Sequence, residues 1–320
     1  MTKSVLTILA SALLVLCIEG AQAAPRTFVS GSGGGATCTR AAPCATFQAA
    51  HDVTDAGGEI NCVDAGDYGG ITVTKSITID CAGTIGGISG GLVATPVTIN
   101  TAGVVVRLRN LTLNGMLSGN VGVRFTNGAA LFVENCVIAN FNSGVPGDGI
   151  GIRFAPPAGV TAELYVTDSI ITSNGRPSDG GGIVVQPGGT GSARVAIERT
   201  RIENNTYGFF ANGMGSTGVI AVQIRDSVAS DNANHGISAF TAAGASTTSI
   251  TFERSSAILN GGDGILAQGP PAFVLLADST VMSNVTGLAA VSGGNIFTYQ
   301  DNQLTGNVAD GAPTASLTVK

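Results

Sequence analysis

Residues 195–205 read VAIERTRIENN, and the same pattern returns at 222–232 (VQIRDSVASDN), 250–260 (ITFERSSAILN) and 274–284 (VLLADSTVMSN). Each copy starts with alternating apolar residues, bends at a charged residue followed by a small one, and ends on Asn. Alternation with a period of two is typical of a strand whose every second side chain faces a core. Repetition at roughly 20 to 50 residues is typical of a solenoid, in which each repeat packs on its neighbours.

The residue at each bend serves as the anchor of one repeat. The anchors are Asn110, Asn135, Asp168, Arg199, Asp226, Arg254, Asp278 and Asp301. Residues two and four positions before the anchor, and three after it, are apolar or nearly so throughout. The anchors lie 23 to 33 residues apart, which fits one coil each with the excess in a variable loop. The sequence therefore predicts an all-β fold, a single-stranded right-handed parallel β-helix (solenoid).

Two polar columns run through the repeats. The position after the anchor holds small residues such as Ser169, Ser227 and Ser255, which suit a crowded inner corner. The position six after it holds Asn174, Asn205, Asn232, Asn260, Asn284 and Asn307. Asn tolerates the left-handed turn conformation, and stacked amides can hydrogen-bond into a ladder. We expect both roles for this Asn column.

The charges at the bend alternate in sign along the anchor column, from Asp168 through Arg199 and Asp226 to Arg254. Neighbouring rungs of a parallel sheet lie about 4.8 Å apart, so like charges stacked there would repel. The alternation favours in-register stacking, and we interpret these charges as structural.

The beginning of the chain has the pattern of a secretory signal. Lys3 precedes an apolar run from Val5 to Ile18, and Ala21 and Ala23 give the small-x-small pattern of a cleavage site. We therefore expect a signal peptide over 1–23, an N-terminal cap with disulfides over 24–70 and the β-helix over 71–320. Residues 43–50 read as a short amphipathic capping helix, with strands expected at 71–73 and 77–79.

Composition limits the partners of the exported chain. A net charge of -6 argues against nucleic acid, and no stretch after the signal is long and apolar enough for a membrane span. The prediction is a secreted or periplasmic protein with no cofactor and no metal.

Export permits disulfides among the cysteines that remain after cleavage. Four of them lie in the cap segment and its neighbourhood, and the preferred pairing joins Cys38 with Cys44 and Cys62 with Cys81. Four cysteines allow three connectivities, so the other pairings stay open. A zinc site is disfavoured because the spacings are wrong and no His accompanies them. Cys136 falls in the small-residue column and reads as a buried thiol.

The capping segment and the rungs after it resemble the right-handed parallel β-helix repeat proteins of the pectin lyase-like superfamily, over about residues 27 to 320. That superfamily holds lyases, hydrolases, epimerases and proteins with no known reaction. Of the polygalacturonase-like motifs only His235-Gly236 is present, and the Asp-Pro-His-Asp pattern of alginate epimerases is absent. The resemblance implies the architecture and leaves the activity open.

One column is chemically varied where the others are uniform. Tyr207, His235 and Asp263 precede the Gly of three consecutive rungs and should project about one strand spacing apart. A His between a phenol and a carboxylate is a plausible general acid/base arrangement for proton abstraction or glycosidic cleavage. The competing interpretation is that these are ordinary polar turn residues.

A second candidate is Arg124 with Arg153, at matching positions of adjacent rungs. Two stacked Arg need compensation, which a carboxylated sugar could provide by bidentate contact. Asp148, in the loop before Arg153, could provide it internally, and we favour this internal partner.

Three functions follow from these features. The leading one is an exported β-helix that engages polysaccharide along one flank of the solenoid, whether or not it is catalytic. The alternative is a non-catalytic surface or adhesion module, and the third is a lyase or hydrolase of uronic-acid polymers. If the Tyr207 group and the Arg124 group lie in one cleft, the enzyme is favoured. If they are scattered over a flat face, the interaction module is favoured.

Overall fold

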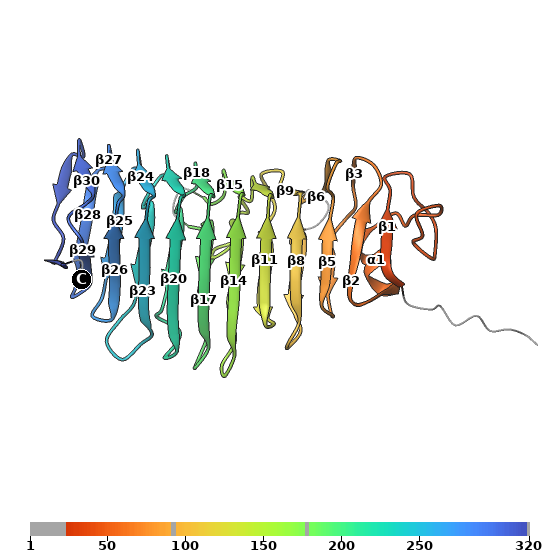
Figure 1. Ribbon diagram of the computed structural model, residues 1–320, viewed down its shortest axis with the longest axis horizontal. Coiled ribbons are helices and arrows are strands. Elements are labelled where there is room, and N and C mark those ends of the chain that lie inside the picture. The colour runs from red at the N-terminus through yellow and green to blue at the C-terminus, as the bar shows by residue number, and fades with distance from the viewer. Residues whose placement is uncertain (1–23, 91–93, 177–178, 319–320) are drawn as a thin grey trace, which may run out of the picture.

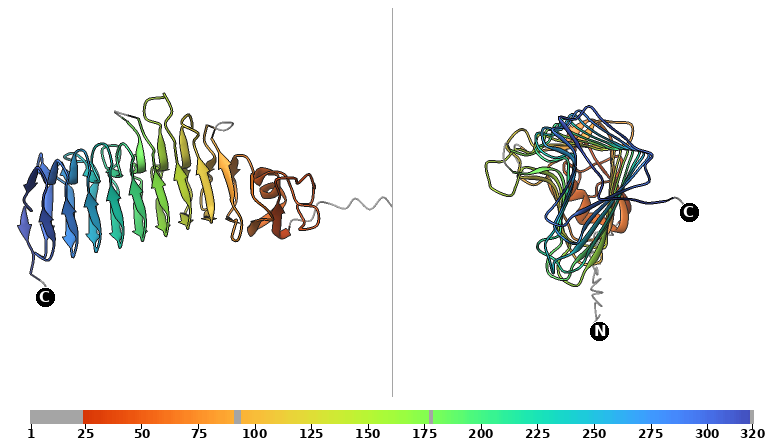
Figure 2. Two further views of the ribbon diagram at one scale, coloured as in Figure 1. Left: turned by 90° about the horizontal axis from the view of Figure 1, so that it is seen from above. Right: turned by 90° about the vertical axis from the view of Figure 1, so that its left-hand side faces the viewer.

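The computed structural model describes residues 24–90, 94–176 and 179–318, so the predicted signal peptide lies outside the described residues. Three parallel sheets, here named sheets 1, 2 and 3, run the length of the molecule (Figure 1). Seen from its end, the chain winds through the three sheets in turn around one apolar interior (Figure 2). The fold is the predicted all-β parallel β-solenoid.

Sheet 1 has twelve strands. They are β1 (Ala24–Val29), β2 (Thr54–Cys62), β5 (Ile77–Asp80), β8 (Val105–Arg109), β11 (Ala130–Glu134), β14 (Thr161–Thr167), β17 (Ser192–Glu198), β20 (Val219–Arg225), β23 (Thr247–Glu253), β26 (Ala272–Ala277), β29 (Asn295–Thr298) and β32 (Ala315–Ser316). Strands β1 and β2 fall in the segment predicted as the cap, so this sheet begins within that segment. Two of the expected strands are present, as β5 and as β4 of the next sheet.

Sheets 2 and 3 have ten strands each. Sheet 2 contains β4 (Ile71–Val73), β7 (Val97–Asn100), β10 (Val121–Asn127), β13 (Ile150–Phe154), β16 (Gly181–Val185), β19 (Phe209–Asn212), β22 (Ile237–Phe240), β25 (Asp263–Gln268), β28 (Thr286–Val291) and β31 (Ala309–Gly311). Sheet 3 contains β3 (Gly66–Asp67), β6 (Gly86–Ser89), β9 (Leu111–Asn114), β12 (Val137–Ala139), β15 (Ile170–Thr172), β18 (Arg201–Glu203), β21 (Val228–Ser230), β24 (Ser256–Ile258), β27 (Thr280–Met282) and β30 (Gln303–Thr305).

The predicted register is the register of the structure. Val195 lies opposite Val222 and Ile197 opposite Ile224 in sheet 1, and all four are buried. Burial of such apolar side chains contributes about 25 cal/mol per Å² and is the main force that holds the rungs together. The alternation of the sequence is thus a direct record of which side chains face the interior.

The bend between sheets 1 and 3 depends on the anchors. They take the left-handed conformation, with φ of 51° at Asp168, 47° at Arg199 and 50° at Asp226. In the last repeat Gln300 takes this conformation in place of Asp301. Left-handed backbone is costly for residues other than Gly, Asn and Asp, so the anchors Arg199 and Arg254 need compensation from their surroundings.

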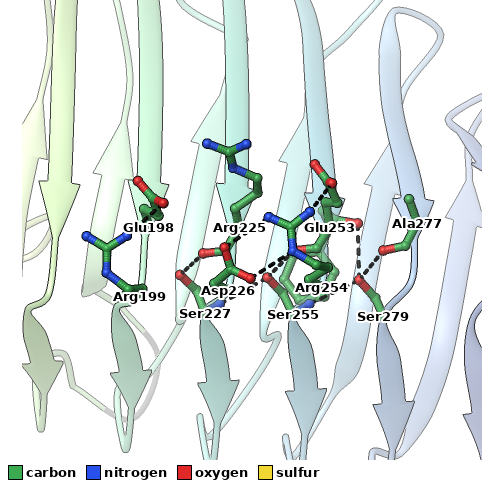
Figure 3. Close-up of polar contacts among 11 residues, drawn as sticks. Glu198, Arg199, Arg225, Asp226, Ser227, Glu253, Arg254, Ser255, Ala277 and Ser279 are labelled. Carbon is green, nitrogen blue, oxygen red and sulfur yellow. Dashed lines mark hydrogen bonds and ion pairs between the residues drawn. The ribbon is translucent and has the colours of Figure 1, made fainter.

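Ion pairs and hydroxyl groups provide that compensation (Figure 3). Arg199 binds Asp168 through Nε and Nη2, at 2.7 and 2.9 Å, and Arg254 binds Asp226 in the same way. Just inside the bend, the backbone N–H of Ser227 donates to Ser255 Oγ at 3.1 Å. The alternating charges therefore pair between rungs, as expected for structural residues.

The Asn column forms the predicted ladder. Asn232 Nδ2 donates to Asn260 Oδ1 at 2.9 Å and to the carbonyl of Ile202, while its Oδ1 accepts from the backbone N–H and Nδ2 of Asn205. The expectation that these Asn are left-handed is wrong. That conformation falls one residue earlier, as at Asp231, because the ladder needs each amide turned inward.

The N-terminal end of the solenoid is covered as predicted. Helix α1 (Phe47–Val53) starts at Thr46, whose hydroxyl accepts from the N–H of Ala49. Gln48 Oε1 and His51 Nε2 accept from the backbone N–H groups of Thr72 and Thr74 at 2.9 and 3.3 Å. The helix thereby satisfies the open edge of sheet 2, which could otherwise pair with another chain.

Two disulfides reinforce this end. Cys38 pairs with Cys44 and Cys62 with Cys81, which is the preferred pairing. The backbone N–H of Cys44 donates to the carbonyl of Phe28, so the first disulfide loop covers the edge of β1. Burial raises the pKa of the Cys136 thiol to about 12, which makes it an inert core residue.

Within the described ranges, no helix has the length and apolar character needed to cross a bilayer.

Replacing one Asn of the ladder should lower the free energy of unfolding strongly. Asn232→Ala leaves the buried backbone N–H of Asn205 without a partner and removes one donor each from Asn260 Oδ1 and the carbonyl of Ile202. A buried polar group left unpaired costs about 1 to 3 kcal/mol. We expect urea unfolding to show a loss on the order of 3 kcal/mol. Asn234→Ala is the matched control, because the Asn234 side chain makes no hydrogen bond to the described residues; equal losses in both variants would contradict the ladder's role.

Stability should fall as the pH drops below about 6.5 because of His51. Burial lowers the pKa of His51 despite the opposing effect of Asp52, and Lys75 lowers it further. At neutral pH His51 is uncharged in both states, whereas below its ordinary pKa of 6.5 the unfolded chain takes up a proton that the folded chain resists. The urea midpoint should therefore decrease between pH 7 and pH 5. His51→Gln should flatten this slope; a slope that His51→Gln leaves unchanged would contradict the assignment.

Candidate functional site

Tyr207, His235 and Asp263 lie on three consecutive rungs at the corner that leads into sheet 2. Tyr207 and His235 come just before β19 and β22, and Asp263 is the first residue of β25. The N–H of Gly208 donates to the carbonyl of His235, and the N–H of Gly236 to that of Asp263. The column continues to Thr286, which lies opposite Asp263. The structure thus brings these three predicted residues together.

His235 and Asp263 contact each other through two alternative hydrogen bonds. His235 Nδ1 lies 3.1 Å from the backbone N of Asp263 and 3.2 Å from its Oδ2. In the neutral imidazole, Nδ1 accepts from the backbone N–H, which places the ring proton on Nε2. In the protonated ring, Nδ1–H can donate to the carboxylate. A ring proton on Nδ1 therefore exchanges the hydrogen bond from the backbone N–H for one to the carboxylate.

The carboxylate of Asp263 is held in its charged form. Burial by itself would raise the pKa of Asp263, but the hydrogen bond and charge of His235, together with a hydrogen bond from Thr286, lower it overall. The side chains of His235 and Asp263 are 28% and 17% exposed, so both are reachable from solvent. Many general-base sites contain an ionised carboxylate that orients a solvent-accessible imidazole in this way.

Aromatic side chains surround this pair on the N-terminal side. The Tyr207 ring lies 5.7 Å from the His235 ring and 5.9 Å from Phe210, which lies 6.0 Å from Phe240. All of these side chains are half-buried. The repeat pattern of the sequence does not single out Phe210 or Phe240, although the alternation that turns Phe209 inward requires Phe210 to point outward.

A buried hydroxyl lies at the base of this cluster. Ser238 is between Phe210 and Leu266 in the register of sheet 2 and is 1% exposed, and its Oγ has no hydrogen-bond partner among the described residues. A buried unpaired hydroxyl costs about 1 to 3 kcal/mol. Such a group is expected where a ligand or water supplies the missing partner.

An open hollow of about 570 Å³ lies on the C-terminal side of the pair. His235, Asp263 and Thr286 border it, and Leu266 and Gln268 contribute to its lining. Aromatic rings, the polar pair and the hollow therefore follow one another along sheet 2 from β19 to β28. The sequence could not predict the hollow, because it depends on the small residues of neighbouring rungs.

Arg124 and Arg153 lie opposite each other on the outer face of sheet 2, on β10 and β13. Arg124 Nη2 donates to Asp148 Oδ1 at 3.1 Å, and Arg153 Nη2 donates to the carbonyl of Gly147. The favoured internal partner is therefore in contact with Arg124. Burial and the charge of Arg124 lower the pKa of Arg153, although Asp148 and Asp179 oppose this.

The two residue groups share a face without touching. Strand β16 separates β13 from β19 in sheet 2, so Arg153 and Tyr207 are on strands about 10 Å apart. Among the described residues, no three His, Cys, Asp or Glu side chains are placed to hold a metal ion.

The charge state of Asp263 should depend on His235. His235→Ala removes the hydrogen bond and the charge that lower the pKa of Asp263 and leaves the effect of burial, so the pKa should rise. Thr286→Val removes a smaller contribution and should cause a smaller rise. Carboxyl carbon chemical shifts followed by NMR over pH 2 to 7 would measure both. An unchanged Asp263 titration in His235→Ala would show that the pair is not coupled.

Comparisons with known proteins agree on the architecture. A model of the right-handed β-helix region matches residues 96–269. The structure is similar to that of pectate lyase Pel9A, with 15% identity and a TM-score of 0.51, over 87% of this chain and 68% of the lyase. The A-module of the Azotobacter vinelandii mannuronan C-5 epimerase AlgE4 aligns with 16% identity and a TM-score of 0.41, over 82% and 91%.

The search of curated proteins finds no match. At 15% identity the pectate lyase establishes a shared fold and nothing about the reaction. The family model, by contrast, covers more than half of the chain, from the strands of the third rung to the loop after β25. The chain therefore belongs to the right-handed β-helix family.

Proposed function

We propose that this protein is exported by a cleavable signal peptide over residues 1–23 and binds polysaccharide along the outer face of sheet 2. The observation that carries the proposal is the order of groups on that face. Half-buried rings of Tyr207, Phe210 and Phe240 adjoin the His235–Asp263 pair, and the hollow follows. A sugar ring has apolar C–H faces that pack on aromatic rings and hydroxyl groups that need polar partners.

The Arg end of the face favours a polymer that carries carboxylates. Arg124, Arg153 and Arg176 contribute three positive charges, whereas Asp148 and Asp179 contribute two negative ones. Asp148 already binds Arg124, so a sugar carboxylate would interact with the remaining positive charge rather than with a free Arg pair. The two disulfides fit a location outside the cytoplasm, secreted or periplasmic.

A catalytic function is the second candidate, and the two hydrogen-bond states of His235 favour it. In this proposal the ring proton of neutral His235 lies on Nδ1 and is donated to the Asp263 carboxylate, which leaves Nε2 to take up a proton from the bound sugar. Asp263 then stabilises the charged imidazole, and Tyr207 positions the ring. Cleavage of a uronic-acid polymer by either route would create a new reducing end. Loss of a ring proton with departure of the glycosidic oxygen, which takes up a proton, would also leave an unsaturated end, whereas attack by water would leave none.

Binding and turnover can be separated in one experiment. Purified protein from residue 24 onward is tested against acidic and neutral polysaccharides, with retardation in polysaccharide-containing gels for binding and with assays of unsaturated and reducing ends. Loss of the Tyr207 or Phe210 ring should weaken binding about tenfold, since a stacked ring contributes about 1 to 1.5 kcal/mol. Met214→Ala, on an exposed loop, is the control and should bind like the unchanged protein.

The outcomes discriminate between the functions. Turnover that His235→Ala abolishes supports the catalytic function, and turnover that survives this change excludes His235 as the base. Binding without turnover leaves a carbohydrate-binding protein. If no polysaccharide binds, the alternative of a surface or adhesion module that presents its loops to a protein partner takes the place of the proposal.

A further inference from the structure

A different arrangement of aromatic rings lies on the outer face of sheet 1. Figure 1 looks onto this sheet, and in the described part of the chain no helix or loop crosses it. Its central outward column runs in register from Arg107 through Phe132, Tyr165, Ala196 and Gln223 to Thr251, Leu275 and Phe297. Aromatic residues thus lie toward both ends of the column, and the residues between them, Ala196, Gln223, Thr251 and Leu275, are not aromatic.

The N-terminal part of this column is a continuous stack. The Arg107 guanidinium lies 3.7 Å from the centroid of the Phe132 ring, and the Phe132 and Tyr165 rings are 4.6 Å apart and inclined by only 7°. This separation is close to one strand spacing, so the faces of the rings are directed along the solenoid axis. One face of Tyr165 covers Phe132, and the other is directed toward the next rung.

The stack stops at the next rung because the residue there is Ala196. A hollow of about 440 Å³ occupies this position and extends over Ala196, Ala221, Gln223, Ser249 and Thr251. At the far side the Phe273 and Phe297 rings, inclined by 14°, resume the aromatic surface. The aromatic column of sheet 1 therefore contains a gap about the size of one ring. The gap opens to solvent, and the uncovered face of the Tyr165 ring bounds it.

Polar groups without protein partners border this gap. The side chains of Gln223 and Thr251 form no hydrogen bond to the described residues, and Ser249 Oγ has only a long contact of 3.5 Å to the carbonyl of Ile220. The two charged groups at the edge, Glu163 and Arg194, face each other at 3.9 Å and largely cancel. Donors and acceptors around a ring-stacking face, without net charge, suit a neutral ring with many hydroxyl groups.

We infer that the outer face of sheet 1 holds a second glycan-binding site, in which a neutral pyranose ring stacks on Tyr165 above Ala196. The hydroxyl groups of the sugar hydrogen-bond with Gln223, Ser249 and Thr251, and the glycan chain continues along the column toward Phe273. The site faces a different direction from the proposed site on sheet 2 and shares no residue with it. The inference does not depend on the proposed function, since it requires neither acidic sugar nor catalysis.

Filling the gap tests the inference without removing a stabilising group. Ala196→Phe adds the missing ring to the stack, so the protein should fold normally, as circular dichroism and urea unfolding would show. Cellohexaose and mannohexaose serve as probes in calorimetric titrations of the whole exported chain. At least one should bind the unchanged protein, and Ala196→Phe and Tyr165→Ala should each weaken its binding by about tenfold or more.

Controls separate this site from the one on sheet 2. Tyr207→Ala should leave binding of the neutral hexasaccharide unchanged, and Ala196→Phe should leave binding of acidic polysaccharide unchanged. The inference is overturned if neither neutral hexasaccharide binds, if a folded Ala196→Phe binds normally, or if Tyr207→Ala alone abolishes binding. It is also overturned if Ala196→Phe instead abolishes self-association in sedimentation experiments, which would identify the face as a protein contact.

Discussion

Each rung of this solenoid must repeat the backbone path of the rung before it, because its strands hydrogen-bond only to the strands above and below. That requirement is most severe at the bends, where the path turns and the sheet hydrogen bonds are interrupted. Here the side chains take over. Asn205, Asn232 and Asn260 hydrogen-bond both to one another and to the backbone at the bend. A shift of one residue in any rung would withdraw an amide from the interior and break contacts on both sides.

The same requirement explains why so much of the fold was predictable. A structural column repeats its chemistry in every rung, so a single sequence contains several independent observations of it, as with Ser227, Ser255 and Ser279. The prediction that the Asn column is left-handed is wrong for a physical reason. Asn by itself favours the left-handed conformation, but in the ladder the hydrogen bonds of its inward amide stabilise the bend more than that preference would. Asp231, Leu259 and Ser283 take the left-handed position instead, although Leu has no preference for it.

The candidate sites were less predictable because they are departures from repetition. His235 was found because a column changed chemistry from rung to rung, and the structure places it beside Asp263 as expected. Phe210 and Phe240 are hard to predict as surface residues, because an aromatic residue in an apolar strand resembles a core residue until it is known which side of the sheet it faces. The hollows beside Thr286 and over Ala196 arise from small residues on several rungs together. Small residues carry no distinctive signal in one sequence.

Satisfied and unsatisfied hydrogen bonds distinguish the two classes of polar residue. In a structural column the polar groups are paired with the neighbouring rung or the bend, as Asn232 pairs with Asn205 and Asn260. Ser238 on sheet 2 and Gln223 and Thr251 on sheet 1 lack protein partners among the described residues, although the rungs around them are regular. A solenoid can hold such groups at little risk to folding, because register is set at the bends and not on the outer faces. Residues on the outer faces can therefore change without disturbing the register, and binding sites can form there. Two of the three outer faces carry aromatic rings beside unpaired polar groups.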